Sequence, residues 1–375
     1  MSVIFMDGFD YYYNSGPGGR KWDQGSSGGN STTGRFGGMY MGTGGNGDYS
    51  TGSAITFKNQ DGTVRNMDTI VFGFAMNVGG YSGAFGNPEF PSHPFVRIQD
   101  LTTVQCSLWI DPSTQYLEVR LGTGEGATPT IVLTTAFAPP LTLWYYLECK
   151  ITMGTSGSVE LMVDGSSIGS VTGVNLQQSG NPYINRLQFC SYNNYAGGVT
   201  AGSWACDDFY VVDCTDGIGS VDYLGEVRIQ TKVPDADGYQ DDFLRSQGLV
   251  NADNVNIIPV SFTDNGYYNY SGTVGAKDLY SIGNFTVSGT IFAVQENISY
   301  KKDDVGNRQV ALLLRTAAQN YIGPFLEGTE PNTYYHSCFS SYTYAGLIWE
   351  KNPQTNAPWA LIDLNLTEFG VKVAS

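Results

Sequence analysis

Four aspartates crowd into the short run PDADGYQDD, which is the best candidate for metal chemistry in the sequence. Asp235, Asp237 and Asp241 would offer hard carboxylate oxygens around a glycine turn, which is the ligand chemistry that Ca²⁺ prefers. The spacing departs from the EF-hand loop, because Gly238 comes too early and no glutamate closes the set. A plain Asp-Gly turn with solvated carboxylates is the competing interpretation. No other cofactor is expected, so calcium is the one candidate.

Two loops combine tyrosine with asparagine, a composition that suits the recognition of sugars or of protein partners. They are SYNNYAGG and DNGYYNYSG, with the candidate residues Tyr192, Asn193, Asn194, Tyr195, Tyr267, Tyr268 and Tyr270. A tyrosine ring presents a large apolar face together with a polar tip. The same composition is typical of protein interfaces, where aromatic residues are enriched and Lys and Glu are depleted. A glycan and a partner subunit therefore both remain as ligands of these loops.

Paired carboxylates of the glycoside hydrolase type are the remaining catalytic option. A retaining enzyme holds its two carboxylates about 5–5.5 Å apart, and a strand places such a pair at even spacing on one face. Glu160 and Asp164 on SVELMVDG come nearest to this pattern, but Asp164 is more simply the first residue of an Asp-Gly turn. His93 lies in the loop PSHPF, and the sequence contains no GxSxG motif. We therefore expect no enzyme activity.

The elements that position these residues are expected to be strands, because the composition excludes other classes of protein. The 375 residues include 48 glycines, 25 tyrosines and 19 phenylalanines, and charged residues reach only 14%. Disordered chains lack aromatic residues, and coiled coils need far more Ala, Glu, Lys and Leu. The net charge of −16 opposes binding to nucleic acid and to anionic membranes, whose phosphates attract basic proteins. A loop-rich, all-β protein is therefore expected.

Short alternating segments, separated by clusters of Gly, Pro, Asp or Asn, run along the chain from residue 54 onward. Strands spaced about 8–12 residues apart predict a sandwich or a barrel. A link rich in Gly, Pro and Asp near residue 222 divides the chain into a first domain, 1–222, and a smaller β-rich domain, 223–375, for assembly or partner contact. Within the second domain, ISYKKDDVGNRQVALLL predicts a hairpin with its polar tip at residues 301–307.

The first domain resembles the laminin-G-like, or concanavalin A-like, jelly roll. The resemblance rests on a Trp-led strand at 144–153, an Asp-Gly turn at 164–165, and a strand that opens with Asp207 and Asp208 before aromatic residues. It implies a sandwich whose closing strand lies beside the opening one, IFMDGFDYY. This fold serves lectins, glycosidases and structural modules alike, so it implies no single function.

The rest of the chain resembles the C-terminal part of tailed-bacteriophage virion proteins, which pair such a block with a laminin-G-like domain. The distinctive pieces are the closing EFGVKV and the W-x₃-P-x-T-x₃-W run of Trp349, Pro353, Thr355 and Trp359. The resemblance implies a non-enzymatic structural component of the virion, on the tail or tail tip, that assembles with itself and with other virion proteins.

Two alternatives accompany this interpretation: a capsid decoration protein, and a glycan-binding module that recognises a host receptor. The N-terminal residues lack the basic and apolar regions of a secretion signal. Synthesis in the bacterial cytoplasm and localisation in the virion are therefore expected.

Overall fold

The computed structural model divides the chain into two compact units. The described residues are 2–12, 21–24, 34–42, 52–59, 62–78, 94–111, 113–125, 128–190, 204–215, 223–256, 266–286, 288–301, 309–326, 336–337 and 343–374. The first unit consists of Met1–Phe57 and Val64–Ile229, and the second of Lys58–Thr63 and Gln230–Ser375. The predicted boundary at residue 222 lies outside the described residues, and the division by contacts falls after Ile229.

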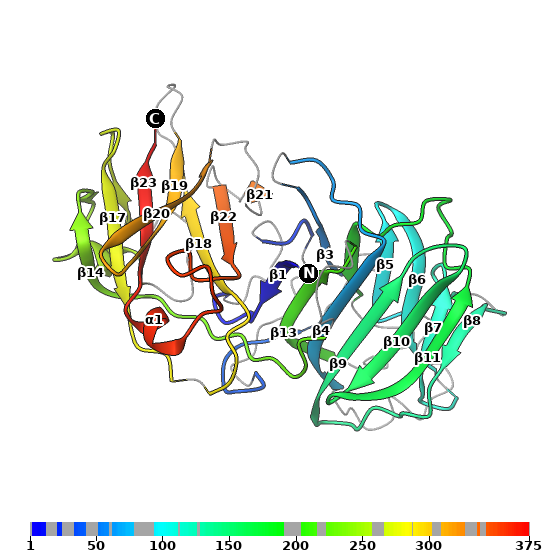
Figure 1. The fold of residues 1–375 in the computed structure, drawn as a ribbon. Helices are drawn as coiled ribbons and strands as arrows, with labels where there is room; N and C mark the ends of the chain where they lie inside the picture. Colours follow the sequence, from blue (N-terminus) through cyan, green and yellow to red (C-terminus); the bar gives the residue numbers. More distant parts are fainter. Residues whose placement is uncertain are drawn as a thin grey trace. The chain divides into compact units, whose positions relative to one another are not determined.

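The first unit is a sandwich of two antiparallel sheets (Figure 1). The seven-stranded sheet has the spatial order β1 (Ser2–Asp7), β13 (Trp204–Asp213), β4 (Thr69–Val78), β9 (Trp144–Thr152), β10 (Gly157–Val163) and β11 (Ser166–Val174), with β2 (Met41–Gly42) also paired to β13. The six-stranded sheet has the order β3 (Ser53–Thr56), β12 (Arg186–Phe189), β5 (Val96–Asp100), β6 (Thr103–Ile110), β7 (Leu117–Leu121) and β8 (Ile131–Thr134). Along β10, buried and half-buried residues alternate strictly, so one side of the strand faces the core and the other faces outward.

Aromatic rings from both sheets fill the space between them. The ring centroid of Phe189 on β12 lies 4.9 Å from that of Phe209 on β13 and 5.2 Å from that of Phe74 on β4. Trp22 and Trp204 pack against the same Phe189 ring and are buried. Edge-to-face pairs of this kind add about 0.5–1.5 kcal/mol each beyond the burial of their area. The cluster therefore determines how the two sheets face each other.

Two features implied by the jelly-roll resemblance are present in the first unit. The opening strand β1 pairs with the closing strand β13, from Ser2 opposite Asp213 to Asp7 opposite Phe209. At residues 164–165, φ angles of 49° and 74° form the two-residue turn that closes the β10–β11 hairpin. The prediction of an all-β jelly-roll sandwich followed by a β-rich part is confirmed.

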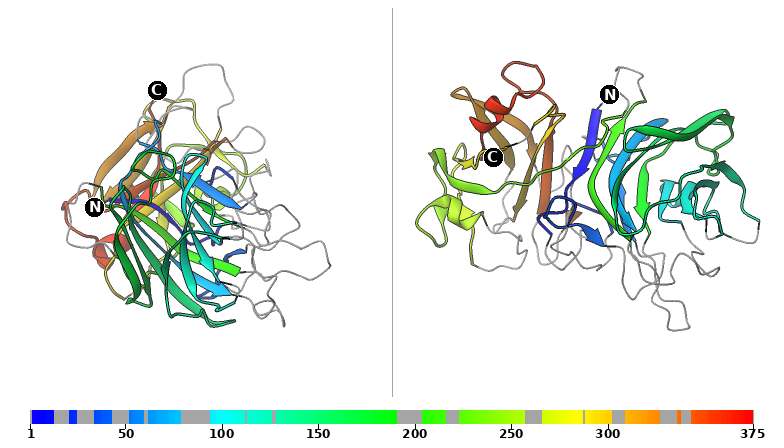
Figure 2. Two further views of the ribbon diagram at one scale, coloured as in Figure 1. Left: turned by 90° about the vertical axis from the view of Figure 1, so that its right-hand side faces the viewer. Right: turned by 90° about the horizontal axis from the view of Figure 1, so that it is seen from below.

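The second unit contains three further antiparallel sheets (Figure 2). The largest has the order β14 (Pro234–Asp241), β17 (Lys277–Ile282), β23 (Glu368–Val373), β19 (Val310–Thr316) and β20 (Gln319–Leu326). The others are β18 (Val294–Tyr300), β22 (Thr343–Trp349) and β21 (His336–Ser337), and the pair β15 (Leu244–Arg245) and β16 (Asn269–Tyr270). A 3-10 helix at Asn251–Asn254 and α1 (Leu361–Asn365) are short. Within the part of the chain that the structure describes, no helix has the length and apolar character of a membrane span.

The hairpin predicted around residues 301–307 is wrong, because its two strands belong to different sheets. β18 pairs with β22, from Val294 opposite Trp349 to Tyr300 opposite Thr343. β19 instead lies between β20 and β23. The apolar run Ala311 to Leu314 is buried on both faces of β19, so this strand gains most from a central place in a sheet. The two strands are adjacent in sequence, but the burial of β19 places it in a different sheet from β18.

Candidate functional site

Exposed tyrosine rings line one face of the short two-stranded sheet in the second unit. In its register Leu244 lies opposite Tyr270 and Arg245 opposite Asn269. Since side chains alternate along a strand, Tyr268 shares its face with Tyr270 and Leu244. The rings of Tyr268 and Tyr270 have centroids 5.9 Å apart and are 41% and 47% exposed. We call residues 244–246 and 267–270 the tyrosine ribbon.

A serine and a glycine lock the register of the tyrosine ribbon. The backbone N–H of Ser246 donates to the carbonyl of Tyr268 at 2.9 Å, and the N–H of Tyr268 donates to Ser246 Oγ at 2.8 Å. The hydroxyl of Ser246 in turn donates to the carbonyl of Gly266 at 2.6 Å. Gly266 has a φ of 82°, a left-handed conformation that glycine adopts without steric cost. Both strands are therefore tied together where the loop closes.

The opposite face of the tyrosine ribbon is anchored by Asn269. Its side-chain amide nitrogen lies 2.9 Å from the carbonyl of Asn251, 3.1 Å from Asp278 Oδ2 and 2.9 Å from the hydroxyl of Tyr280. Its side-chain oxygen accepts a hydrogen bond of 2.8 Å from Asn254 Nδ2. One side chain thus joins the ribbon to the 3-10 helix and to β17.

Asp278 is the centre of this anchoring network and is fully buried. Its carboxylate accepts hydrogen bonds from Asn251 Nδ2 at 2.7 Å and from the hydroxyl of Tyr280. Burial raises the pKa of Asp278 to about 6, although the hydrogen bonds that it accepts act in the opposite direction. A buried network with several donors on one carboxylate is rigid, so the backbone that carries Tyr268 and Tyr270 is held before any ligand arrives.

The structure does not bring the predicted calcium ligands together. Asp237 instead accepts hydrogen bonds from the backbone N–H groups of Asn251 at 3.1 Å and Ala252 at 2.6 Å, which caps the 3-10 helix. Asp235 and Asp241 are exposed on β14. Among the described residues, no three Asp, Glu, His or Cys side chains form a group able to hold a metal ion. Calcium binding there stays a prediction.

The predicted aromatic loops have different positions relative to the described structure. Tyr192, Asn193, Asn194 and Tyr195 lie outside the described residues. Tyr267, Tyr268 and Tyr270 lie on the tyrosine ribbon, all between 41% and 47% exposed. Sequence reasoning missed the anchoring residues Asn251, Asn254, Asn269 and Asp278. The available signal was the alternation Tyr-Asn-Tyr at 268–270, which places the amide on the face opposite the rings.

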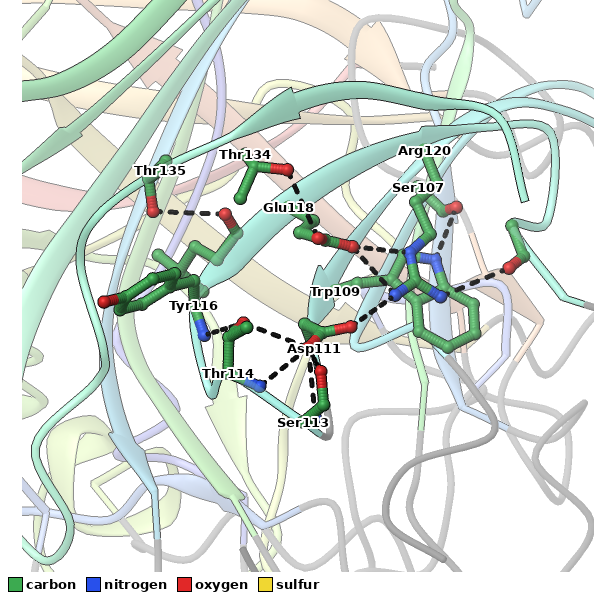
Figure 3. Close-up of polar contacts among 12 residues, drawn as sticks. Ser107, Trp109, Asp111, Ser113, Thr114, Tyr116, Glu118, Arg120, Thr134 and Thr135 are labelled. Carbon is green, nitrogen blue, oxygen red and sulfur yellow. Dashed lines mark hydrogen bonds and ion pairs between the residues drawn. The ribbon is translucent and has the colours of Figure 1, made fainter. Parts of the chain in front are cut away.

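A second polar cluster lies on β6 and β7 of the first unit (Figure 3). The guanidinium of Arg120 bonds Glu118 at 2.8 and 2.9 Å, contacts Asp111 at 3.3 Å, and lies 4.2 Å from the ring centroid of Trp109. Thr134 donates to the second oxygen of Glu118 at 3.2 Å. Asp111 also accepts bonds from the backbone and hydroxyl groups of residues 113 and 114. Because its charges already satisfy one another in a buried place, this cluster stabilises the sandwich and does not present an open site.

Replacing Arg120 with lysine is expected to lower the free energy of unfolding of the first unit by about 2 kcal/mol. Lysine keeps the charge but loses the planar fork that bonds Glu118 and stacks on Trp109. Urea denaturation followed by tryptophan fluorescence measures the change. The more accessible pair Arg65–Asp213, whose side chains are 31% and 10% exposed, provides the comparison, since Arg65→Lys should cost less than about 1 kcal/mol. Equal costs at both positions would contradict the role given to the fork.

The hydrolase candidates Glu160 and Asp164 each accept a hydrogen bond from within the chain. Asp164 occupies the hairpin turn, and its Oδ1 accepts the backbone N–H of Tyr146 at 2.8 Å. Glu160 Oε2 accepts the hydroxyl of Tyr223 at 3.0 Å. Both carboxylates therefore already have partners within the chain, and His93 lies outside the described residues.

No protein-family model matches the chain, and no curated protein matches its sequence. Similar solved structures include an alginate lyase of Aplysia kurodai, with 9% identity, a TM-score of 0.31, and coverage of 49% of this chain and 86% of that chain. An endo-β-1,4-glucuronan lyase of Trichoderma reesei has 14% identity, a TM-score of 0.36, and coverage of 56% and 95%. The galectin LEC-6 of Caenorhabditis elegans has 10% identity, a TM-score of 0.27, and coverage of 44% and 93%. At these values the likeness assigns no residue and no activity to this chain.

The prediction of a structural component of a tailed-phage virion is wrong. No family model and no curated protein supports a virion identity, a virion location or assembly with virion proteins, and none of the similar structures named above is a virion protein. The expectation that the chain has no enzyme activity stays a prediction. The run that carried the phage resemblance has a packing role, because the indole N–H of Trp359 donates to the carbonyl of Trp349 at 2.9 Å and Trp359 is buried. Because these tryptophans pack within the second unit, their spacing does not indicate where the protein is located.

Proposed function

We propose that this protein binds glycans through the tyrosine ribbon. The observation that carries the proposal is the pair of exposed rings, Tyr268 and Tyr270, side by side on a ribbon whose other face is held by a buried network. Sugar rings pack their apolar faces on aromatic rings, and a tyrosine hydroxyl at the rim adds a hydrogen-bond partner. Rings that are already fixed lose little conformational entropy when a ligand stacks on them.

The chemistry of the tyrosine ribbon favours binding over cleavage. Catalysis of glycan cleavage needs an acid or a base within hydrogen-bond reach of the substrate. Asp278 is fully buried beneath the ribbon, and its oxygens are bonded to Asn251, Asn269 and Tyr280. Its carboxylate therefore holds the ribbon in place and does not meet a ligand on the other face.

The double variant Tyr268→Ala/Tyr270→Ala is expected to weaken glycan binding by roughly a hundredfold, about tenfold for each ring removed. The parent is first placed on a glycan array to identify a bound sugar, and calorimetry then measures the affinity of both proteins. Tyr239→Ala is the matched control, because Tyr239 is a more exposed tyrosine of the same unit, 71% exposed, whose ring is stacked by Arg315 at 4.0 Å. Binding that survives the double variant, or is lost equally in the control, would contradict the proposal.

A further inference from the structure

Residues 223–229 lie across the outer face of the seven-stranded sheet in the first unit, and we call them the strap. The outer face is the side turned away from the six-stranded sheet. Phe209 packs against Phe189 of that sheet, so Tyr210, the next residue along β13, lies on the outer face, where it contacts Tyr146 and Glu148. This segment lies outside the tyrosine ribbon. Four hydrogen bonds join it to side chains of the sheet.

The strap donates hydrogen bonds to acceptors on the sheet. The N–H of Gly225 donates to Glu148 Oε1 at 2.9 Å, and the N–H of Leu224 donates to the hydroxyl of Tyr210 at 3.1 Å. The hydroxyl of Tyr223 donates to Glu160 Oε2 at 3.0 Å. Further along, the N–H of Ile229 donates to Asp208 Oδ1 at 2.6 Å. Three carboxylates and one tyrosine hydroxyl of the sheet therefore accept hydrogen bonds from successive N–H and O–H groups of the strap.

Two buried tyrosine rings and a buried carboxylate lie together on the outer face of the sheet at this place. The rings of Tyr146 and Tyr210 lie nearly parallel, with planes 11° apart and centroids separated by 6.4 Å. Gly73 lies beneath them, where a Cβ atom would come within 2.5 Å of the Tyr210 ring and 3.0 Å of Glu148. Glycine at this position thus leaves room for the side chains of Tyr146, Glu148 and Tyr210 on the same face of the sheet. Aromatic faces beside hydrogen-bond acceptors match a ring-shaped ligand rich in hydroxyl groups.

The charges of the covered face determine which ligand it suits. Glu148, Glu160 and Asp208 contribute carboxylates, and the guanidinium of Arg35 is already engaged, at 3.4 Å from Asp208 and 3.0 Å from the carbonyl of Val227. A ligand that carries carboxylates would meet like charges here, which opposes binding. Hydroxyl groups of an uncharged sugar can donate to Glu148 and Glu160 as the strap does.

We propose that the outer face of the seven-stranded sheet is a second carbohydrate site, for uncharged polysaccharides, and that the strap is an intramolecular cover that occupies it. The strap reproduces with its own N–H and O–H groups the donors that sugar hydroxyls would supply. Displacement of the strap would remove the donors that it supplies to Glu148, Glu160 and the hydroxyl of Tyr210, while the hydroxyl of Tyr210 still donates to Glu148. This site is separate from the tyrosine ribbon and does not depend on it.

The test uses the full chain with Tyr268→Ala/Tyr270→Ala as background, so that the tyrosine ribbon is silent. Tyr223→Phe/Gly225→Pro opens the strap, because Phe lacks the donating hydroxyl and Pro lacks the N–H and cannot adopt the φ of 75° found at Gly225. The matched control is Tyr183→Phe/Gly180→Pro, the same exchange in another loop of the first unit where Gly180 has a φ of 83°. Amide hydrogen exchange at residues 223–229 reports opening. Binding is measured with hydroxyethylcellulose, dextran and galactomannan, and with carboxymethylcellulose as the charged counterpart of the first.

The open variant is expected to exchange faster at the strap and to bind at least one uncharged polysaccharide at least tenfold more tightly than its background. Glu148→Gln added to the open variant should remove most of the gain, and carboxymethylcellulose should show none. The proposal is overturned if the strap opens without a gain for any uncharged probe, or if the charged probe gains equally. It also fails if exchange at the strap is unchanged, since the bonds described above would then not hold the cover. The loop control should match its background in both measurements.

Discussion

Replacing Asn269 with alanine is expected to lower the free energy of unfolding of the second unit by about 3 kcal/mol and to abolish glycan binding at the tyrosine ribbon. The side chain bonds Asn251, Asn254, Asp278 and Tyr280, and alanine would leave these buried partners short of a donor or an acceptor. A buried polar group without a partner costs about 1–3 kcal/mol, which is why the loss exceeds that of an ordinary hydrogen bond. The ribbon would then lose its anchor, and Tyr268 and Tyr270 their fixed positions.

Urea denaturation and calorimetric binding test this result together. Asn320→Ala is the control, because Asn320 bonds Gln240 at the exposed surface of the same unit and its loss should cost less than about 0.5 kcal/mol. An Asn269→Ala protein that keeps both stability and binding would show that the buried network does not support the ribbon. Loss of stability with full binding would separate the two roles and contradict the preorganisation argued above.

The free energy of unfolding of the first unit, which contains Asp207 and Asp208, and of the second unit, which contains Asp278, is expected to fall as the pH rises from about 5 to about 8, by an amount on the order of 2 kcal/mol. Burial, reinforced by the charge of Asp208, raises the pKa of Asp207 well above its ordinary range, and burial also raises the pKa of Asp208. Asp278 follows the same direction, with burial raising its pKa to about 6. A carboxyl group with a raised pKa holds its proton in the folded state and releases it in the unfolded state. The folded state therefore binds more protons than the unfolded state, and stability declines with pH above about 4.

Denaturation at constant ionic strength between about pH 5 and about pH 8 measures this slope. Asp207→Asn is expected to flatten it, since an amide does not titrate, whereas the exposed Asp235→Asn should leave it unchanged. Burial lowers the pKa of Lys21 to about 8, which acts in the opposite direction at higher pH and sets the upper end of the range. Stability that rises between pH 5 and pH 8 would show that the Asp207–Asp208 pair is ionised in the folded state.

The candidate sites show how far composition alone reaches. Tyrosine-rich loops are visible in the sequence, because exposure of aromatic residues beside Gly, Asn and Ser is a local property. The partners of Asn269 are not visible, since Asn251 and Asp278 lie 18 and 9 positions away, on the 3-10 helix and on β17, and neither element pairs with the strand that carries Asn269. The strap is hidden for the same reason. Gly225 and Glu148 are separated by 77 positions, and no local pattern relates them.

The run with abundant aspartate shows that proximity in the chain does not by itself bring carboxylates together. Asp235, Asp237 and Asp241 suggested a shared cation because they are close in the chain. In the fold Asp237 caps the 3-10 helix, while Asp235 and Asp241 face solvent. Carboxylates near one another in sequence converge only if the backbone turns them inward, and an extended strand does not.

Alternation of apolar and polar residues and the Asp-Gly turn at 164–165 act within a few residues, so they indicate the class of fold from the sequence. The pairing of strands, as with β18 and β22, and the polar groups beneath the tyrosine ribbon and the strap become known only from the folded units. The physical reason is that a strand's period is local, whereas its partner is chosen by the burial and hydrogen bonding of the whole unit. The binding surfaces proposed here belong to that second kind of information.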